Sequence, residues 1–174
     1  MKYTVILLSF FLFACNANSQ EKQLKVGDPI PSFSLSDENG KVFNSKDYVG
    51  KKILVIYFYP KDESPVCTKE SCAFRDSYTD FEKAGAIVVG INDGSVESHK
   101  SFQENHQLPF FLLSDPNKQV VNLFGVKGKF GMIGRETFVV DLNGKIVYTF
   151  DSFMKGSAHA ENALDFVKKM NTQK

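Results

Sequence analysis

The sequence predicts a single α/β domain, with a central mixed β-sheet flanked by helices and an N-terminal β-hairpin. Three observations carry this prediction. Short apolar and β-branched runs alternate with segments of helical periodicity, a turn dipeptide opens the domain, and another turn dipeptide joins its last two strands. Strands that alternate with helices and then end in a hairpin are typical of a mixed sheet with helices on both faces. The chain of 174 residues is long enough for one such core after a removable leader.

The expected strands are rich in β-branched and aromatic residues. Residues 32–43 alternate around Asn39 and Gly40, a dipeptide that is favoured in tight hairpin turns because both residues tolerate positive φ. Residues 53–59 form a continuous apolar run, as expected for a strand covered on both faces, and Pro60 ends it because proline has no N–H to donate. The remaining expected strands are residues 86–91, 110–113, 137–141 and 145–150.

Four segments have the spacing of helices. Residues 68–83 place Cys72 among their less polar positions and are followed by Gly85 as a stop, so Cys67 lies at the start of a helix. Ser95 is a suitable N-cap for the next helix. The other expected helices are residues 96–107, a turn and helix over residues 115–124, and an amphipathic helix over residues 158–170 with Ala163, Leu164, Phe166 and Val167 as its buried side.

The charge of the chain is balanced, with 21 basic and 20 acidic side chains and a net charge of +1. The basic residues are scattered rather than gathered along one segment, so we expect no nucleic-acid partner. Lys168, Lys169 and Lys174 do gather near the C-terminus, where a solvated last helical turn explains them better than contact with a membrane surface.

The N-terminus is predicted to be a signal peptide. Lys2 precedes an apolar run over residues 5–14 that is too short to span a bilayer, which needs about 20 residues. The run ends in Leu12, Phe13, Ala14 and Cys15, which resembles the lipobox of bacterial lipoproteins.

The lipobox resemblance implies that residues 1–14 are removed and that Cys15 is lipidated as the first residue of the mature protein. Residues 15–25 then form a tether, and residues 26–174 form the domain. The alternative is a simple cleaved secretory leader with an incidental cysteine. We expect an exported protein, periplasmic or held on a membrane of a bacterial cell envelope by its lipid anchor.

Cys67 is the candidate nucleophile. A cysteine reacts as the thiolate, and a free thiol with a pKa of about 8.5 is only a few per cent ionised near pH 7. The first turn of a helix favours an anion through its free N–H groups, and a cationic side chain from elsewhere in the fold can add to this effect. Because helix starts are common, this position alone does not single out a reactive cysteine.

A longer motif surrounds Cys67. Residues 57–72 read YFYPKDESPVCTKESC, and residues 134–141 read GRETFVVD far downstream. With these segments the chain resembles the peroxiredoxins (AhpC/TSA family), and among them the bacterioferritin comigratory protein or peroxiredoxin Q group, over the whole mature domain. The resemblance implies a thioredoxin-like fold. Two positions depart from the usual pattern of the group, since Ser64 stands in place of the more frequent Thr and Val66 in place of the more frequent Gly.

The resemblance also implies a role for each residue of the motif. Cys67 is the peroxidatic cysteine, which attacks a peroxide and becomes a sulfenic acid. Arg135 stabilises the thiolate and holds peroxide oxygens, and Ser64 bonds the peroxide through its hydroxyl. Pro60 shapes the loop and shields the thiolate from water. Taken singly, such an arginine is usually a surface charge and such a serine a helix cap, but their combination with Cys67 favours the functional interpretation.

Cys72 is the expected resolving cysteine, because the resemblance implies an intramolecular disulfide with Cys67. If both residues are helical in the reduced protein, their Cα atoms lie about 8.7 Å apart, beyond the separation of about 7 Å that a disulfide spans. The first turn of the helix must then unwind when the disulfide forms. The alternative is an ordinary buried thiol on the apolar face of the helix.

Neither a cofactor nor a metal is expected. His99, His106 and His159 have no ligand spacing with each other or with the cysteines, and they are interpreted as surface histidines. Glu70, close to the candidate site, either orients an arginine or favours the helix start through its charge.

The resemblance therefore implies a thiol peroxidase that reduces hydrogen peroxide and organic hydroperoxides. Its expected partner is an exported thioredoxin-like reductant, and its expected state is a monomer or weak dimer. Two alternatives require other cysteine patterns: a thioredoxin-like thiol-disulfide oxidoreductase normally has C-x-x-C, and a copper-binding protein on the same scaffold needs C-x-x-x-C with a histidine ligand. A permanent structural disulfide is disfavoured by the helical separation of the two cysteines.

Overall fold

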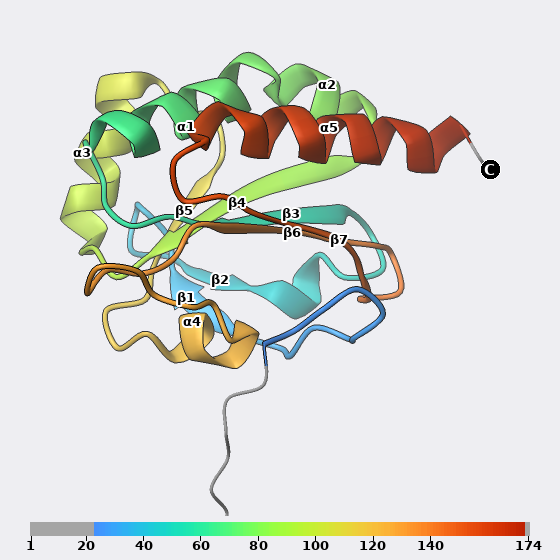
Figure 1. Cartoon of the computed structure of the whole chain (residues 1–174), viewed down its shortest axis with the longest axis horizontal. Coiled ribbons are helices and arrows are strands. Elements are labelled where there is room, and N and C mark those ends of the chain that lie inside the picture. Colours follow the sequence, from blue (N-terminus) through green and yellow to red (C-terminus); the bar gives the residue numbers. More distant parts are fainter. Residues whose placement is uncertain (1–22, 173–174) are drawn as a thin grey trace, which may run out of the picture.

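A seven-stranded mixed sheet runs through the centre of the molecule (Figure 1). The computed structural model describes residues 23–172. The strands lie in the order β2-β1-β5-β4-β3-β6-β7. Their bounds are β1 Ser34–Ser36, β2 Val42–Asn44, β3 Ile53–Phe58, β4 Ala86–Asn92, β5 Phe111–Ser114, β6 Glu136–Val140 and β7 Ile146–Asp151.

The pairing of the strands confirms the predicted mixed sheet. The central strands β3, β4 and β5 are parallel, whereas β6 runs antiparallel to β3 and β7 antiparallel to β6. The predicted N-terminal hairpin is formed by β1 and β2, with Leu35 opposite Phe43, and β1 joins the sheet through β5. The predicted final hairpin is formed by β6 and β7.

The helices cover the two faces of the sheet unequally. In Figure 1, α1, α2 and α5 lie over one face, and α4 lies on the opposite side with the hairpin of β1 and β2. The bounds of the helices are η1 Ser45–Asp47, a short 3-10 helix, α1 Pro65–Asp76, α2 Tyr78–Lys83, α3 Val96–His106, α4 Gln119–Phe124 and α5 Gly156–Thr172.

The prediction of one helix over residues 68–83 is wrong in two respects. The helix begins earlier, at Pro65, because proline suits the first helical position, where the missing N–H would have no helical partner. It also divides at Ser77, whose ψ of 0° is not helical and separates α1 from α2.

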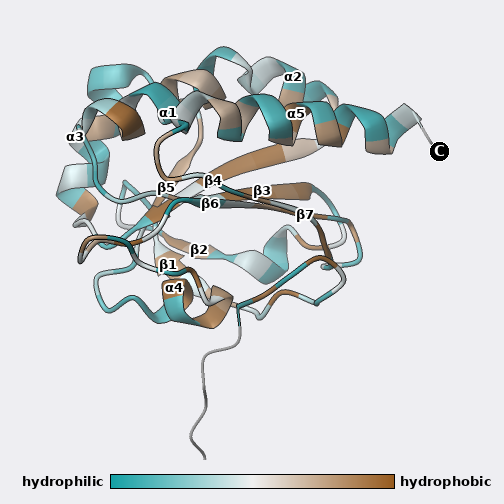
Figure 2. Cartoon of the chain, viewed as in Figure 1, coloured by the Kyte–Doolittle hydropathy of each residue, from teal (hydrophilic) through white to brown (hydrophobic). Residues whose placement is uncertain are grey.

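Two apolar cores share strand β3, which is buried along its whole length. Val55 and Tyr57 face a core that includes Phe74 of α1 and Ala163 of α5. The alternate residues of β3 face a second core on the other side of the sheet, with α4 and β6. Figure 2 shows the central strands as the most hydrophobic part of the ribbon. Burial on both faces explains the continuous apolar run of this strand.

The first described residues already contact the domain. The backbone N–H of Leu24 donates to the carbonyl of Phe124 at 3.0 Å, and the Gln23 side chain donates to Glu136. The end of the expected tether therefore lies against the fold. The expected signal peptide and Cys15 lie outside the described residues. Within residues 23–172, no helix has the length and apolar character needed to cross a membrane.

Candidate active site

Cys67 lies in the first turn of α1, as the sequence predicts, and its side chain is completely buried. Its sulfur accepts a hydrogen bond from Nη2 of Arg135 over 3.2 Å. The two residues are 68 positions apart in the chain, and the fold brings the start of α1 next to the segment just before β6. The structure thus brings the guanidinium of Arg135 into contact with the Cys67 sulfur.

Arg135 is held rigidly, with only 2% of its surface exposed. Its Nε donates to the backbone carbonyl of Phe153 at 2.9 Å, and its Nη1 pairs with Oε2 of Glu70. Three of its five N–H groups are therefore used by groups of the described chain, and the planar fork is fixed before any substrate arrives.

Glu70 is a buried partner of this arginine. It lies one turn after Cys67 on α1 and is fully buried. Burial raises its pKa to about 8, although the charge and hydrogen bond of Arg135 act in the opposite direction. Of the two roles expected for Glu70, the structure therefore shows contact with an arginine.

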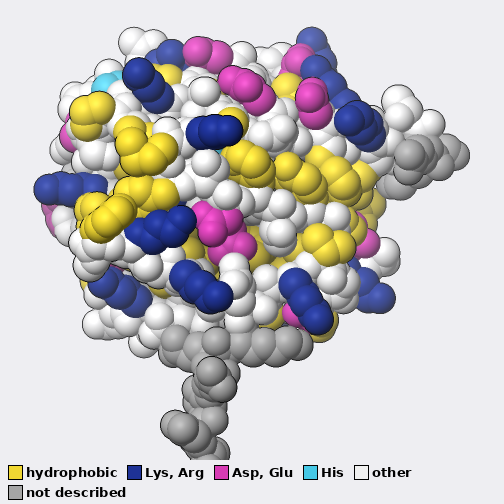
Figure 3. Space-filling model, in the orientation of Figure 1, with side chains coloured by type: hydrophobic (Ala, Val, Ile, Leu, Met, Phe, Trp, Pro, Cys, Tyr) yellow, Lys and Arg dark blue, Asp and Glu magenta, His cyan; other side chains and the backbone are white. Residues whose placement is uncertain are grey.

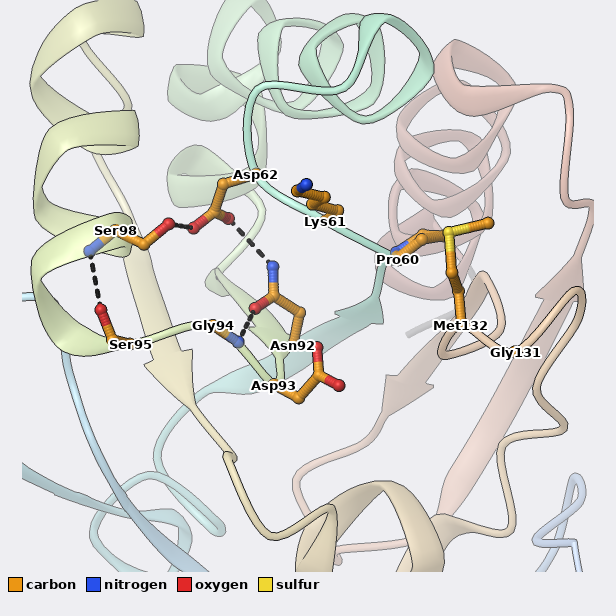
Figure 4. Close-up of a pocket in the computed structure, with 10 residues that line it drawn as sticks. All are labelled: Pro60, Lys61, Asp62, Asn92, Asp93, Gly94, Ser95, Ser98, Gly131 and Met132. Carbon is orange, nitrogen blue, oxygen red and sulfur yellow. Dashed lines mark hydrogen bonds between the residues drawn. The ribbon is translucent and has the colours of Figure 1, made fainter.

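Ser64 and Pro60 lie in the loop that leads from β3 to α1. Ser64 has the extended N-cap backbone, but its side chain makes no capping bond within the described part of the chain. The alternative of a helix cap is thus not realised, and its hydroxyl is half-buried next to the first turn. Pro60 is buried and, with Met132, lines a cavity of about 340 Å³ beyond the end of β3 (Figure 4).

Apolar side chains surround the arginine on the surface side. The Phe153 ring lies 6.0 Å from the Arg135 guanidinium and contacts the ring of Phe130, with 5.7 Å between the ring centroids. Phe130, Met132 and Met154 are exposed, and apolar side chains gather on this side of the molecule in Figure 3. The buried guanidinium therefore lies beneath an exposed apolar rim.

Cys72 lies five residues after Cys67 on the same uninterrupted helix, and both are free thiols in the described chain. Cys72 is half-buried. The condition for the expected unwinding is met, because two helical residues at this spacing are too far apart for a disulfide.

Asp62 holds the loop between Pro60 and Ser64 against α3. One of its carboxylate oxygens accepts from Asn92 at 2.9 Å and the other from Ser98 at 2.5 Å (Figure 4). The first oxygen also accepts from Tyr59 at 2.8 Å, and the second contacts Nδ1 of His99 at 2.8 Å. Burial opposes the ionisation of Asp62, but the His99 charge and these hydrogen bonds prevail and lower its pKa.

A second anchor is formed by the next residue of the loop. Glu63 has a left-handed backbone with φ of 58°, and its carboxylate binds Asn105 at 2.9 Å and His106 at 2.8 Å on α3. A non-glycine residue in this conformation needs support from its surroundings. The two adjacent acids thus fix the loop that precedes Cys67.

Comparison with known proteins identifies the family. The AhpC/TSA family model matches residues 26–149. This chain belongs to the AhpC/TSA family. Its relatives include the chloroplastic peroxiredoxin Q of Sedum lineare, 42% identical over 155 residues that cover 88% of this chain and 83% of the relative.

Solved structures agree with this assignment to the peroxiredoxin Q group. Peroxidoxin BcpB from Mycobacterium tuberculosis has a TM-score of 0.80 at 33% identity, covering 85% of this chain and 99% of that one. The bacterioferritin comigratory protein of Xanthomonas campestris, described with an alkyl peroxide reduction activity, has a TM-score of 0.74 at 30% identity, covering 82% and 99%. The thioredoxin-like fold expected from the resemblance is confirmed.

Two of the three histidines of this peroxiredoxin are not on the surface, so that prediction is wrong for them. His99 is buried with Nδ1 against Asp62 and Nε2 against the carbonyl of Leu113 at 3.2 Å. Both neighbours only accept hydrogen bonds, so the ring carries hydrogen on both nitrogens and forms a buried ion pair. His159 is buried beside Glu70, and His106 is partly exposed.

A positional signal for these histidines existed. His99 stands three residues before the buried Phe102, and His159 stands four residues before the buried Ala163, so each falls on the inward face of its helix. Among residues 23–172, no group of three or more His, Cys, Asp and Glu side chains could hold a metal ion.

Proposed function

We propose that this peroxiredoxin is a thiol peroxidase in which Cys67 reduces hydroperoxides. The observation that carries the proposal is the 3.2 Å contact between the Cys67 sulfur and a buried, rigid Arg135. The thiolate attacks the distal oxygen of ROOH, the O–O bond breaks, and the sulfur becomes a sulfenic acid. The leaving RO⁻ takes up a proton and departs as an alcohol, or as water when the substrate is hydrogen peroxide.

Arg135 supplies the electrostatic part of this step. Two of its N–H groups, one on each terminal nitrogen, remain after its contacts with Phe153, Glu70 and Cys67 in the described chain. They can donate to the two peroxide oxygens as negative charge develops on the leaving one. Donors that are fixed in advance stabilise a transition state without reorganisation, which is why the anchoring contacts matter.

Ser64 and Pro60 complete the proposed site. The Ser64 hydroxyl, which makes no capping bond within the described chain, accepts the hydrogen of the peroxide or donates to its oxygen. Pro60 forms a buried wall without an N–H of its own. The apolar rim of Phe130 and Phe153 suits the organic part of an alkyl hydroperoxide as well as hydrogen peroxide itself.

Cys72 resolves the intermediate. Its thiol attacks the sulfenic sulfur of Cys67, a disulfide forms, and water leaves. A thioredoxin-like dithiol then reduces the disulfide by exchange, becomes a disulfide itself, and returns both thiols. The alternative functions are not favoured, because four residues separate the cysteines rather than the two of an oxidoreductase or the three of a copper site.

The proposed location rests on the sequence alone. We propose that residues 1–14 direct export and that Cys15 is lipidated, so the reductant is an exported thioredoxin-like protein. Membrane fractionation and mass spectrometry of the mature N-terminus test this, since a Cys15→Ser variant that stays membrane-bound would contradict lipid anchoring.

The function is tested by stopped-flow consumption of hydrogen peroxide and cumene hydroperoxide by the reduced, leaderless protein. Fast single-turnover oxidation should vanish in Cys67→Ser. It should persist in Cys72→Ser and end in a sulfenic acid that a dimedone probe labels. A reaction no faster than that of a free thiol would contradict peroxidase activity.

A further inference from the structure

Glu70 has a second neighbour on the side that does not face Arg135. Its Oε1 atom is the one buried side-chain nitrogen or oxygen within residues 23–172 that has no hydrogen-bond partner. Nδ1 of His159 lies 3.6 Å from this oxygen, and both side chains are fully buried. A buried carboxylate oxygen without a partner is costly, so this gap calls for an explanation.

The hydrogen bonds of His159 fix its protonation. Nε2 lies 3.1 Å from the backbone carbonyl of Ser152, which can only accept, so Nε2 carries the hydrogen. Nδ1 lies 2.8 Å from the hydroxyl of Thr137, which can donate to it. The ring is neutral when this hydroxyl is the donor, and an unprotonated nitrogen then lies towards the unpartnered oxygen of Glu70. Burial agrees with this assignment, since it lowers the pKa of His159 to about 4.

A neutral acceptor opposite Oε1 favours the protonated form of Glu70. An ionised carboxylate would set two acceptors against each other, whereas a carboxyl protonated on Oε1 can donate to Nδ1 of His159. Oε2 can still accept from Arg135 in this form. In this form Nδ1 accepts from Glu70 instead of from Thr137, whose hydroxyl turns away, and Oε1 closes its separation of 3.6 Å from Nδ1 to hydrogen-bond distance. Oε1 has no other partner in the described chain.

The balance of charges in the site also favours protonated Glu70. One buried guanidinium, Arg135, contacts two acids, Cys67 and Glu70. If both acids were ionised, the buried cluster would carry a net negative charge, which desolvation disfavours. When Cys67 loses its proton and Glu70 holds one, the cluster is neutral. The pKa of Glu70, raised to about 8 by burial, places its protonated form in the physiological range.

We propose that His159 is a positioning residue of the peroxidase reaction, which accepts a hydrogen bond from protonated Glu70 and so leaves the charge of Arg135 to the Cys67 thiolate. The proposal rests on the proposed function but concerns the resting enzyme. Its proton balance is simple: ionisation of Cys67 with protonation of Glu70 leaves the total charge unchanged.

The other ionisable groups near Glu70 and His159 do not reverse these protonation states. The phenol of Tyr57 on β3 stays neutral, because burial raises its pKa well above the ordinary value. Asp151, at the end of β7, favours protonation of His159, but the effect of burial on His159 is larger.

The first test is a pH titration of Cys67 thiolate absorbance in a Cys72→Ser background of the leaderless protein. His159→Phe removes the acceptor and should raise the titration midpoint by about one pH unit, as expected when a competing anion forms within 4–6 Å. His159→Asn keeps an acceptor near the Nδ1 position and should recover most of this shift. No shift in His159→Phe would overturn the proposal.

A double-mutant cycle separates positioning from general structural damage. In a Glu70→Gln background the charge of residue 70 cannot change, so adding His159→Phe should not move the midpoint further. An equal shift in both backgrounds would mean that His159 acts through the fold and would overturn the proposal. These midpoints remain readable if the protein shows no peroxidase activity, so failure of the two proposals can be told apart.

A third measurement needs no change at His159. Infrared spectra at neutral pH should show the C=O stretching band of a protonated carboxyl in Cys72→Ser protein and lose it in Cys72→Ser with Glu70→Gln. Absence of this band in the first protein would overturn the proposal even if every His159 variant failed to fold.

Discussion

Oxidation to the disulfide should unwind the first turn of α1. Five residues of helix between Cys67 and Cys72 mean about 7.5 Å of rise and about 140° of rotation, which places their Cα atoms about 8.7 Å apart. A disulfide rarely spans more than about 7 Å, so the two atoms must approach by about 1.7 Å or more. The turn cannot supply this without opening its hydrogen bonds, beginning with the bond of 2.8 Å from the Thr68 N–H to the Ser64 carbonyl.

The size of the effect follows from these bonds. If two helical hydrogen bonds open at about 1 kcal/mol each, the protection of the amides falls by about thirtyfold. Hydrogen exchange with mass spectrometry should show this loss over residues 67–73 after one equivalent of peroxide. Peptides from α3 should be unchanged. Cys72→Ser, which cannot form the disulfide, should keep its protection when treated in the same way.

Equal protection of residues 67–73 in the reduced and disulfide forms would refute the reasoning. It would mean that the disulfide forms inside an intact helix, or that Cys67 pairs with another thiol. Mapping of the disulfide by mass spectrometry separates these two causes.

Three further changes have defined outcomes. Arg135→Lys keeps the charge but loses the fixed fork, so the stopped-flow rate with peroxide should fall about a hundredfold; an unchanged rate would remove Arg135 from the mechanism. Asp62→Asn leaves the buried cation of His99 without its partner and should lower the free energy of unfolding in urea by about 3 kcal/mol or more near pH 7. Because the pKa of Asp62 is lowered in the folded protein, its contribution to the free energy of unfolding is full above the ordinary pKa of 3.8 and is lost as the pH falls through the folded pKa. Only the wild type should show this loss of stability in acid. Parallel stability profiles of the wild type and Asp62→Asn against pH would contradict the ion pair. A Cβ at Gly134 would overlap the carbonyl oxygen of Lys127, so Gly134→Ala should lower both the melting temperature and the peroxide rate, and calorimetry that shows no change would argue against this close packing.

The elements that the sequence predicts well are those with a local cause. The run from Ile53 is apolar at every position because both faces of β3 are covered, and Asn39 with Gly40 makes the turn between β1 and β2. The break at Ser77 has no such signal, because apolar side chains keep their helical spacing on both sides of it. Its cause is tertiary, since α1 packs mainly on α5 whereas α2 packs mainly on β4.

The site was predictable only in part. Cys67 at a helix start can be inferred locally, but Arg135 lies 68 residues away, and no spacing rule brings the two together. The family resemblance supplied that link. The contacts of Asp62 with His99 and of Glu70 with His159 were missed because they join different helices and loops, and pairwise contacts of this kind leave no periodic pattern.

The anchoring of Arg135 has a consequence for the return half of the catalytic cycle. Its Nε is tied to the Phe153 carbonyl, outside α1, so this anchor of the guanidinium persists when the first turn of α1 opens and the sulfur of Cys67 leaves. The position beside the Arg135 guanidinium that the sulfur occupied is then vacant, among apolar side chains. Once a reductant releases Cys67 as a thiolate, Coulomb attraction favours its return to this place. Refolding of the first turn of α1 and return of the Cys67 thiolate to Arg135 are thus coupled, and the resting enzyme regains its reactive anion as the helix re-forms.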